Sequence, residues 1–460
     1  MSEKQKIHFV GIGGAGMSGI AKVLLELGYP VSGSDLHLSE TTKRLEKMGA
    51  RIFLGHHDEN LDHQVGTVVV SSAIPKHNNE VVKAQVLDIP VIQRAQMLAM
   101  LMNRQKGIAV AGAHGKTTTS SMISLVFEKN EMDPTVVVGG ELNDIGGNAK
   151  LGQGEYLVAE ADESDGSFLK LHSHITVVTN IEDDHLDYYG TKENIIKAFC
   201  EFILATDSEG FTVMCLDDPV IQGILPLIKA EKKVITYGFT SNADFCALNV
   251  RLNGLYTKAD VYNRGKLLGE LRLSIPGKHN VLNALATVAV SINCGLSFSA
   301  VANSLQTFHG VQRRFQDIGE CSGIHIIDDY AHHPTELKAT LAAARTLNPE
   351  RIVAVFQPHR YTRTHLLARE FGEAFRDADI LILDEIYAAG ESPIPGVNTG
   401  LIVEQIKEQT GQPVEYIPGR AEIEERLFGL IQPGDLVITM GAGNIWSVGT
   451  DLLQRLRAQQ

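Results

Sequence analysis

The chain has 460 residues, of which 44% are hydrophobic and 21% charged, a balance typical of a globular protein with roughly two to four domains. Its formal net charge of −14 argues against nucleic-acid binding, which usually depends on a basic surface. The first residues are polar, no apolar run is long enough to span a bilayer, and the five cysteines are scattered without a CxxC pair. These features predict a cytoplasmic protein with reduced thiols and no membrane contact.

Short β-branched apolar runs alternate with helical stretches along the chain, which is typical of parallel sheets with crossover helices. The pattern predicts an α/β protein of three domains: a Rossmann-like N-terminal domain, a P-loop ATPase-type central domain with a mostly parallel sheet, and a Rossmann-like C-terminal α/β domain. The expected boundaries are 1–104, 105–311 and 312–460. The later part of the central domain, 234–276, is predicted to be a meander of shorter strands.

The first predicted strand, Ile7–Val10, leads into the sequence GIGGAG at 11–16 and a helix over 17–27. A second strand, Tyr29–Ser32, ends near Asp35. This is the G-x-G-x-x-G pattern in its strand–turn–helix context, with an acid about 20 residues further on. The glycines would let the backbone approach a pyrophosphate at the helix N-terminus, and Asp35 would accept hydrogen bonds from a ribose. NAD and a UDP-sugar both fit this chemistry.

A phosphate-binding loop is predicted where the strand Ile108–Ala111 runs into GAHGKTTT at 112–119 and a helix to about Lys129. The loop resembles a Walker A motif, although Val110 stands where the strict pattern has its first glycine. Backbone N–H groups would surround phosphates, Lys116 would neutralise their charge, and the Thr117 hydroxyl would reach Mg²⁺.

Acidic residues follow two further strands of the central domain. The strand Tyr156–Ala159 ends in EADE at 160–163, and the strand Thr176–Thr179 is followed by EDDHLD at 182–187. The carboxyl ends of parallel strands meet at one edge of a sheet, so these acids would lie beside the phosphate loop and could bind Mg²⁺. The alternative is an ordinary solvated acidic loop.

The third domain is expected to contain four strands, at Ile324–Ile327, Arg351–Phe356, Asp379–Leu383 and Leu436–Met440, with helices between them. Together with the two loops, its motifs resemble the Mur ligase family over essentially the whole chain. The motifs are GIGGAGMSG at 11–19, GAHGKTTT at 112–119, EADESD at 160–165, NIEDDHLDYYG at 180–190, GKHNVLNALA at 277–286, RRF at 313–315, DDYAHHPTE at 328–336, QPHRYTR at 357–363 and GAGNIW at 441–446.

Several motifs look like the first amino-acid-adding member of the family. The resemblance therefore implies ATP-dependent ligation of L-alanine to the lactyl carboxylate of UDP-N-acetylmuramate, a step of peptidoglycan precursor synthesis. An acyl phosphate would be the intermediate, and ADP and phosphate would be products. Mg²⁺ is the implied metal, with Mn²⁺ as an alternative. The expected partners are these small molecules, and the expected state is a monomer or a weak homodimer.

The resemblance also implies the functional residues. The UDP-sugar would lie against Gly13, Gly14, Ala15, Gly16, Asp35, Ser71, Ser72 and Ala73. ATP would contact Gly112, Ala113, His114, Gly115, Lys116, Thr117, Thr118, Asn180, His279, Asn283, Arg314 and Asp329. The metal ion would bind Thr117, Glu160 and His185. The amino acid and the substrate carboxylate would contact Tyr330, His332, Arg360 and Arg363. The catalytic residues would be Lys116, Arg314 and His332, with His332 or Asp329 as the base.

Other functions explain less of the chain. An NAD(P)-dependent oxidoreductase accounts only for the first glycine turn, and a nucleotide switch accounts only for the phosphate loop. Within the family, the ligase that adds recycled tripeptide has a cysteine where Gly13 stands here, and the diaminopimelate-adding ligase has an Asp-Asn-Pro segment that this chain lacks. Phe199 occupies the position of the modifiable lysine of several later-acting ligases, so no carbamylated lysine is expected.

Overall fold

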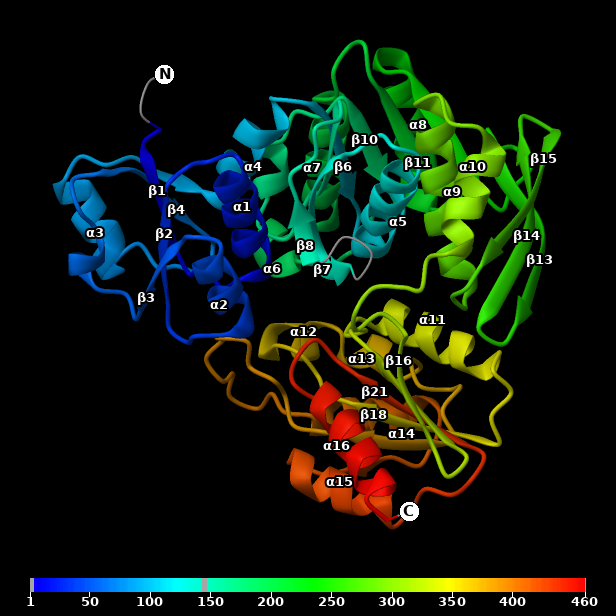
Figure 1. Ribbon diagram of the computed structural model, residues 1–460. Coiled ribbons are helices and arrows are strands. Elements are labelled where there is room, and N and C mark those ends of the chain that lie inside the picture. The colour runs from blue at the N-terminus through cyan, green and yellow to red at the C-terminus, as the bar shows by residue number, and fades with distance from the viewer. Residues whose placement is uncertain (1–3, 143–146, 460) are drawn as a thin grey trace. The chain divides into compact units, whose positions relative to one another are not determined.

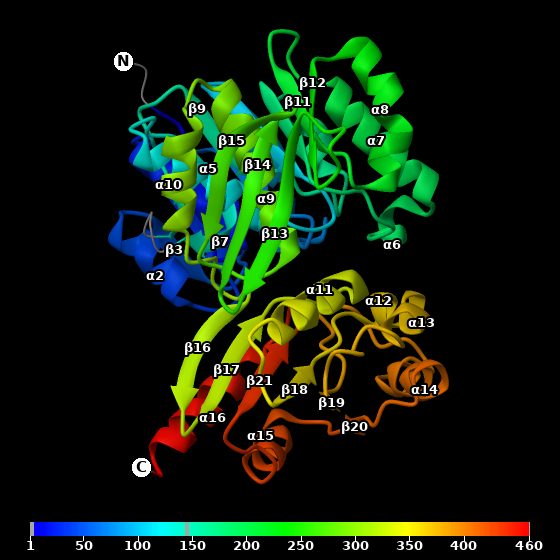
Figure 2. The ribbon, with the colours of Figure 1, turned by 90° about the vertical axis from the view of Figure 1, so that its right-hand side faces the viewer.

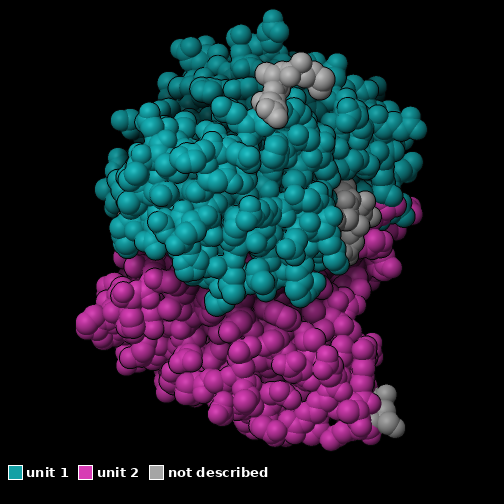
Figure 3. All heavy atoms as spheres, turned by 60° about the vertical axis from the view of Figure 1, so that its left-hand side comes forward, with its two compact units in different colours: residues 1–248, 260–270, 282–306 teal, residues 249–259, 271–281, 307–460 magenta. Residues whose placement is uncertain are grey.

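The computed structural model describes residues 4–142 and 147–459 (Figure 1). The chain divides into two compact units, coloured separately in Figure 3. Unit 1 consists of residues 1–248, 260–270 and 282–306, and unit 2 of residues 249–259, 271–281 and 307–460. All five cysteines are free thiols, as predicted. Among the described residues, no helix has the length and apolar character needed to cross a membrane.

The first sheet of unit 1 is fully parallel, with the strand order β3-β2-β1-β4-β5. Its strands are β1 Lys6–Val10, β2 Val31–Asp35, β3 Arg51–Leu54, β4 Val65–Val70 and β5 Val91–Gln93, and its helices are α1 Ala15–Glu26, α2 Glu40–Lys47, α3 Asn79–Val86 and α4 Arg94–Met102. This is the order of a Rossmann-type sheet, in which ligands bind where the order reverses, beside β1. The second strand starts later than predicted, and Asp35 is its last residue.

The central sheet has the order β15-β14-β13-β12-β11-β10-β6-β9-β7-β8. Its first seven strands along the chain are β6 Lys106–Ala111, β7 Thr135–Leu142, β8 Gly147–Lys150, β9 Tyr156–Glu160, β10 Ile175–Val178, β11 Phe211–Cys215 and β12 Val234–Gly238. Neighbouring strands of the run β12-β11-β10-β6-β9-β7 pair in parallel, and β8 pairs antiparallel with β7. The helices that follow these strands or complete the unit are α5 Lys116–Lys129, α6 Leu186–Tyr189, α7 Lys192–Leu204, α8 Pro219–Glu231, α9 Lys278–Asn293 and α10 Phe298–Gln306.

The predicted meander of shorter strands is wrong in strand length. Figure 2 shows its strands as long arrows: β13 Phe245–Asn253, β14 Tyr256–Asn263 and β15 Lys266–Leu273. They have 9, 8 and 8 residues, against 4 or 5 in β9, β10 and β11. Buried and exposed positions alternate along β14 and the second half of β13, so one face is solvated. Such strands need no continuous apolar run and can extend further than fully buried ones.

The sheet of unit 2 has the order β16-β17-β21-β18-β19-β20. Its strands are β16 Gln316–Cys321, β17 Ile324–Asp329, β18 Arg351–Phe356, β19 Ile380–Leu383, β20 Glu415–Tyr416 and β21 Asp435–Met440. The four predicted strands are present, while β16, which pairs antiparallel with β17, and the two-residue β20 were not foreseen. Most residues of β16 are partly or fully exposed, so its sequence gives only a weak signal for a strand.

Helices cover both faces of this sheet. The adjacent residues Ile326 and Ile327 belong to different core clusters, because neighbouring side chains of a strand point to opposite faces. One cluster includes residues of α11 Pro334–Arg345, α13 Ala368–Phe371 and α14 Gly400–Gln409. The other includes residues of α15 Arg420–Phe428 and α16 Trp446–Arg457. Short α12, Tyr361–Leu366, follows β18.

Candidate active site

The strand order of the central sheet brings the predicted phosphate loop and acidic segments to one edge. β6, which precedes the loop, pairs in parallel with β9 on one side and β10 on the other. Glu160 is the last residue of β9, and Asn180 lies two residues past the end of β10. The expectation that these segments meet at the carboxyl edge of one sheet is therefore confirmed.

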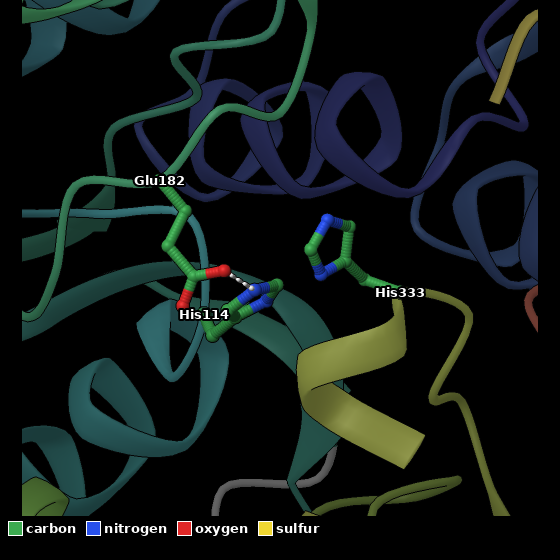
Figure 4. A group of neighbouring side chains, drawn as sticks. All are labelled: His114, Glu182 and His333. Carbon is green, nitrogen blue, oxygen red and sulfur yellow. Dashed lines mark hydrogen bonds and ion pairs between the residues drawn. The ribbon is translucent and has the colours of Figure 1, made fainter. Parts of the chain in front are cut away.

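Residues after β10 brace the backbone of the phosphate loop. The Asn180 side chain accepts from the His114 N–H and donates to the His114 carbonyl, both at 2.9 Å. The Thr179 hydroxyl donates to the same carbonyl at 2.6 Å. On the loop itself, the His114 ring lies 3.3 Å from the Glu182 carboxylate, the contact drawn as a dashed line in Figure 4. The structure therefore gives Asn180, a predicted ATP contact, a role in holding the loop.

Lys116, the first residue of α5, is anchored by the loop and by an acid. Its Nζ donates to the Gly112 carbonyl at 2.5 Å and the Ala113 carbonyl at 3.2 Å, and lies 2.7 Å from Glu163 Oε1. Burial alone would lower the pKa of Lys116, but Glu163 and Asp162 outweigh it and raise the pKa, so the lysine stays charged. Burial raises the pKa of Glu163, and Lys116 opposes that shift.

Two of the three predicted metal ligands meet. The Thr117 hydroxyl lies 2.5 Å from Glu160 Oε1, and the other oxygen of Glu160 accepts from the Gly139 N–H. A hydroxyl and a carboxylate suit a hard cation such as Mg²⁺. The third, His185, has a left-handed φ of +60° and places Nε2 3.5 Å from Asp184 and 3.8 Å from Glu163. The side chain of Asp187 is outside the described part of the chain.

The other end of the predicted ATP site contains Asn283 of α9. Gly115 has a φ of +83°, and a Cβ added there would lie 2.6 Å from Asn283 Oδ1. The same oxygen accepts from the Thr119 hydroxyl at 3.2 Å. Thr118, which precedes Thr119 in the chain, is buried in the first turn of α5. The absence of a side chain at Gly115 thus lets the predicted adenine contact approach the phosphate loop.

The glycine turn after β1 forms with its acid in place. The Gly13 N–H donates to Asp35 Oδ2 at 2.8 Å, and the Gly14 N–H donates to the Gly11 carbonyl at 3.2 Å. Gly14 caps α1, and Ala15 and Gly16 form its first turn. The segment Ser71, Ser72 and Ala73 follows β4, which pairs with β1, so both predicted parts of this site share one edge.

In unit 2, one of the residues predicted to face ATP, Asp329, is a buried acid that fixes the backbone around it. Asp329, the last residue of β17, accepts from the Phe315 and Ala331 N–H groups, both at 2.7 Å. Burial raises the pKa of Asp329 to about 6, although Arg314 opposes the shift. Burial and Arg314 together lower the pKa of His279 to about 4. Arg314 therefore contributes to the pKa shifts of both Asp329 and His279.

Two of the residues predicted to bind the amino acid, Tyr330 and His332, form an aromatic and basic cluster with Arg314 in unit 2. The Arg314 guanidinium lies 5.0 Å from the Tyr330 ring centre, and the Tyr330 and His332 ring centres are 5.4 Å apart. His332 Nδ1 lies 3.0 Å from the Tyr330 carbonyl. Arg360 and Arg363 lie at the start of α12, where Arg360 has a φ of +71°.

Three family models match almost the whole chain. The description "Mur ligase family, catalytic domain" matches residues 6–106, "Mur ligase middle domain" matches 110–291, and "Mur ligase, glutamate ligase domain" matches 313–443.

This chain belongs to the Mur ligase family.

Individual Mur ligases are similar to this chain over its full length. The UDP-N-acetylmuramate–L-alanine ligase of Pelotomaculum thermopropionicum is 54% identical, with 100% of this chain and 99% of the relative covered. The crystal structure of the UDP-N-acetylmuramate–alanine ligase MurC of Thermotoga maritima has 30% identity and a TM-score of 0.84, covering 99% of this chain and 100% of that one. The murein peptide ligase of Psychrobacter arcticus, at 23% identity, TM-score 0.72 and 98% coverage of both chains, is a likeness of fold.

Sequence reasoning missed two residues of this Mur ligase. Glu163 lies within the acidic segment predicted to bind Mg²⁺, but its ion pair with Lys116 was not foreseen. His359 joins the basic cluster: its ring centre is 5.7 Å from that of His332 and stacks on Tyr387 at 5.7 Å, and its Nδ1 accepts from Arg363 at 3.3 Å. Burial and the positive groups around it lower the pKa of His359 to about 3. The signal that could have identified His359 is its position in the sequence, three residues after β18 and directly before Arg360.

Phe199 of α7 stands at the position where several later-acting Mur ligases have a modifiable lysine, and its side chain is buried. Its side chain is 1% exposed, and its ring centre is 5.3 Å from that of Phe168. A lysine at this position would have to bury its charge among aromatic rings, which is unfavourable.

Proposed function

We propose that this chain is an ATP-dependent ligase that joins L-alanine to the lactyl carboxylate of UDP-N-acetylmuramate, giving ADP and phosphate in peptidoglycan precursor synthesis. The observation that carries the proposal is the 54% identity, over the full length, to a ligase named for this reaction. The structure supports it through the loop at 112–119, which has the lysine, threonine and acids of a phosphate-transfer site. Neither an oxidoreductase nor a simple nucleotide switch would use both this loop and the glycine turn at 11–16.

The proposed chemistry begins with activation of a carboxylate. A carboxylate is a poor electrophile, and transfer of the γ-phosphoryl group of ATP to it gives an acyl phosphate. Charge on the transferring group must be stabilised, and Lys116 and Arg314 are the cations proposed for this role. The acids around Lys116 keep its pKa raised, so it would bring a full positive charge to the phosphates.

Mg²⁺ would be held by Thr117 and Glu160, whose oxygens already lie 2.5 Å apart, with His185 as the third proposed ligand. When bound, the ion would neutralise phosphate charge. Mn²⁺ prefers similar oxygen ligands and is a possible replacement. In this arrangement the chain positions the ligand atoms, while Asn180 keeps the phosphate loop in shape.

The second step is attack of the L-alanine amine on the acyl phosphate, and this amine must lose a proton. We assign His332 as the base. An Nδ1–H donating to the Tyr330 carbonyl puts the basic lone pair of the neutral ring on Nε2. Asp329 is the weaker candidate, because both its oxygens accept backbone N–H groups. Arg360 and Arg363 would bind carboxylates, for which the guanidinium geometry is suited.

The proposal includes the organisation of the chain. We place the UDP-sugar domain at 1–104, the ATP domain at 105–311 and the C-terminal domain at 312–460, which the family matches at 6–106, 110–291 and 313–443 support. Cytoplasmic location is proposed because the reaction consumes ATP and a UDP-activated sugar. A monomer or weak homodimer, acting on small molecules alone, is the proposed state.

The test is phosphate release from ATP with Mg²⁺ and UDP-N-acetylmuramate, across single amino acids and the tripeptide L-alanyl-γ-D-glutamyl-meso-diaminopimelate. Release that requires both the sugar nucleotide and L-alanine is expected. Release with the tripeptide instead would move the function to the recycling ligase. No release with any acceptor, in a protein that binds ATP, would refute the proposed substrates.

A further inference from the structure

Arg94 lies between the glycine turn and the acidic loop of the phosphate site. It is the first residue of α4, and its side chain is 20% exposed. Two contacts tie helix α1, which begins at the turn, to the central sheet within unit 1: Asn148 donates to the Ala15 carbonyl at 2.7 Å, and Lys22 donates to the Ala149 carbonyl at 2.6 Å. The position of Arg94 relative to both loops is therefore defined by packing inside one unit.

One side of the Arg94 side chain packs against the turn. A Cβ built on Gly16 would lie 3.0 Å from Arg94 Nη1 and 3.1 Å from Arg94 Cδ. Gly16 is in the first turn of α1, which has no acidic residue, and this is the end of the helix where a diphosphate would bind. A side chain at this position would therefore require the Arg94 guanidinium to shift by a few tenths of an ångström.

The other side of the guanidinium faces the acidic loop. Arg94 Nη2 lies 3.4 Å from Asp162 Oδ2, in the segment that follows β9. The Asp162 carboxylate and the Arg94 guanidinium therefore form an ion pair between the glycine turn and the loop of the phosphate site.

Helix stability does not explain this arginine. A cation in the first turn opposes the helix dipole, which favours acids at that end. Arg94 occupies the first position of the nine-residue helix α4, which has no acid in its first turn. The charge is therefore unfavourable for its own helix, and its contacts lie with the two loops.

We propose that Arg94 binds the diphosphate of the sugar nucleotide and that its ion pair with Asp162 couples the glycine turn to the phosphate loop. This rests on the proposed function. An anion at the turn and the Asp162 carboxylate compete for one guanidinium. Loss of Arg94 therefore weakens diphosphate binding, whereas loss of the Asp162 charge strengthens it, provided that Arg94 is present.

Calorimetric titration of the full chain with UDP, and then with UDP-N-acetylmuramate, tests this. In Arg94→Gln, affinity should fall roughly tenfold or more, the effect of a lost charge-assisted hydrogen bond. Asp162→Asn keeps an oxygen that can accept from the Ser164 N–H and should bind UDP more tightly than the wild type. In the double variant, the gain from Asp162→Asn should vanish. Arg104→Gln, an exposed arginine just beyond the other end of α4, is the matched control.

The outcomes separate the two proposals. Unchanged UDP affinity in Arg94→Gln would overturn the assignment of Arg94 while leaving the proposed function standing. Weakening in Arg94→Gln without any gain in Asp162→Asn would overturn the coupling. A wild-type chain that binds neither probe would overturn the proposed function itself and this inference with it. Thermal melting of each variant establishes that the affinities refer to folded protein.

Discussion

Lys116 Nζ lies 2.7 Å from Glu163 Oε1, so the lysine of the phosphate loop is held by a buried acid before any phosphate is bound. The side chain of Glu163 is only 4% exposed, and Lys116 also donates to two loop carbonyls. The lysine is thus pre-positioned at the start of α5. A bound phosphate would replace one negative partner with another and would need little rearrangement of the loop.

Lys116→Ala should abolish ATP-dependent phosphate release. Removing one preorganised group that stabilises charge in a transition state typically lowers kcat by about a hundredfold to a thousandfold. Lys129→Ala is the control, because it makes the same change at the exposed C-terminal end of the same helix. Steady-state phosphate release measures both. Turnover within a few-fold of the wild type in Lys116→Ala would refute the role of the loop.

ATP binding is expected to be lost at alkaline pH, and Glu163→Gln should move this loss to a lower pH than in the wild type. Burial lowers the pKa of Lys116, and Glu163 makes the largest opposing contribution, so the variant should have a lower lysine pKa than the wild type. Because the charged lysine binds phosphate, affinity is lost as pH rises through that pKa. Titration of ATP binding between about pH 7 and pH 10 measures the effect. Glu155→Gln breaks an exposed Lys–Glu pair as the control. Superimposable pH profiles for wild type and Glu163→Gln would contradict the prediction.

Gly115→Ala should weaken ATP binding more than it weakens the fold. Gly115 has a φ of +83° and a Cβ there would meet Asn283, whereas Gly396 has a φ of +81° and no heavy atom within 4 Å of an added Cβ. Both alanine variants should lose about 1–2 kcal/mol of unfolding free energy through left-handed strain. Only Gly115→Ala should also lose ATP affinity, because Asn283 must move. Denaturant titration and ATP binding separate the effects, and equal ATP affinity in the two variants would count against this geometry.

His359→Gln should make the protein less sensitive to acid. The pKa of His359 is lowered to about 3 in the folded chain, against about 6.5 when unfolded, so the unfolded state binds the proton more readily. The neutral His359 ring therefore costs the folded chain no stability above about pH 6.5. The free energy of unfolding then decreases as the pH falls from there toward 3. Urea unfolding at pH 7.5 and pH 5 should show a smaller decrease in the variant than in the wild type. The exposed His63→Gln is the control, and an equal decrease in all three proteins would contradict the prediction.

Much of the fold was predictable because its elements have local patterns. Buried parallel strands need continuous apolar runs, and the predicted strand Arg351–Phe356 matches β18 residue for residue. The phosphate loop was predictable for a similar reason, since its glycines and lysine act within a few residues of one another. The antiparallel β16 was not, because a half-exposed strand depends on its neighbour β17 for pairing as well as on its own sequence.

The sequence by itself determined the α/β class, the two nucleotide loops and the family. Only the tertiary structure decided which acid serves which group: Glu160 contacts Thr117, Glu163 contacts Lys116, and Asp162 contacts Arg94 across 68 positions. These three acids lie within the four-residue segment 160–163, and no local pattern distinguishes them. Their partners depend on the direction in which each side chain leaves the end of β9 and on which strands lie beside it, and packing of the whole unit sets both.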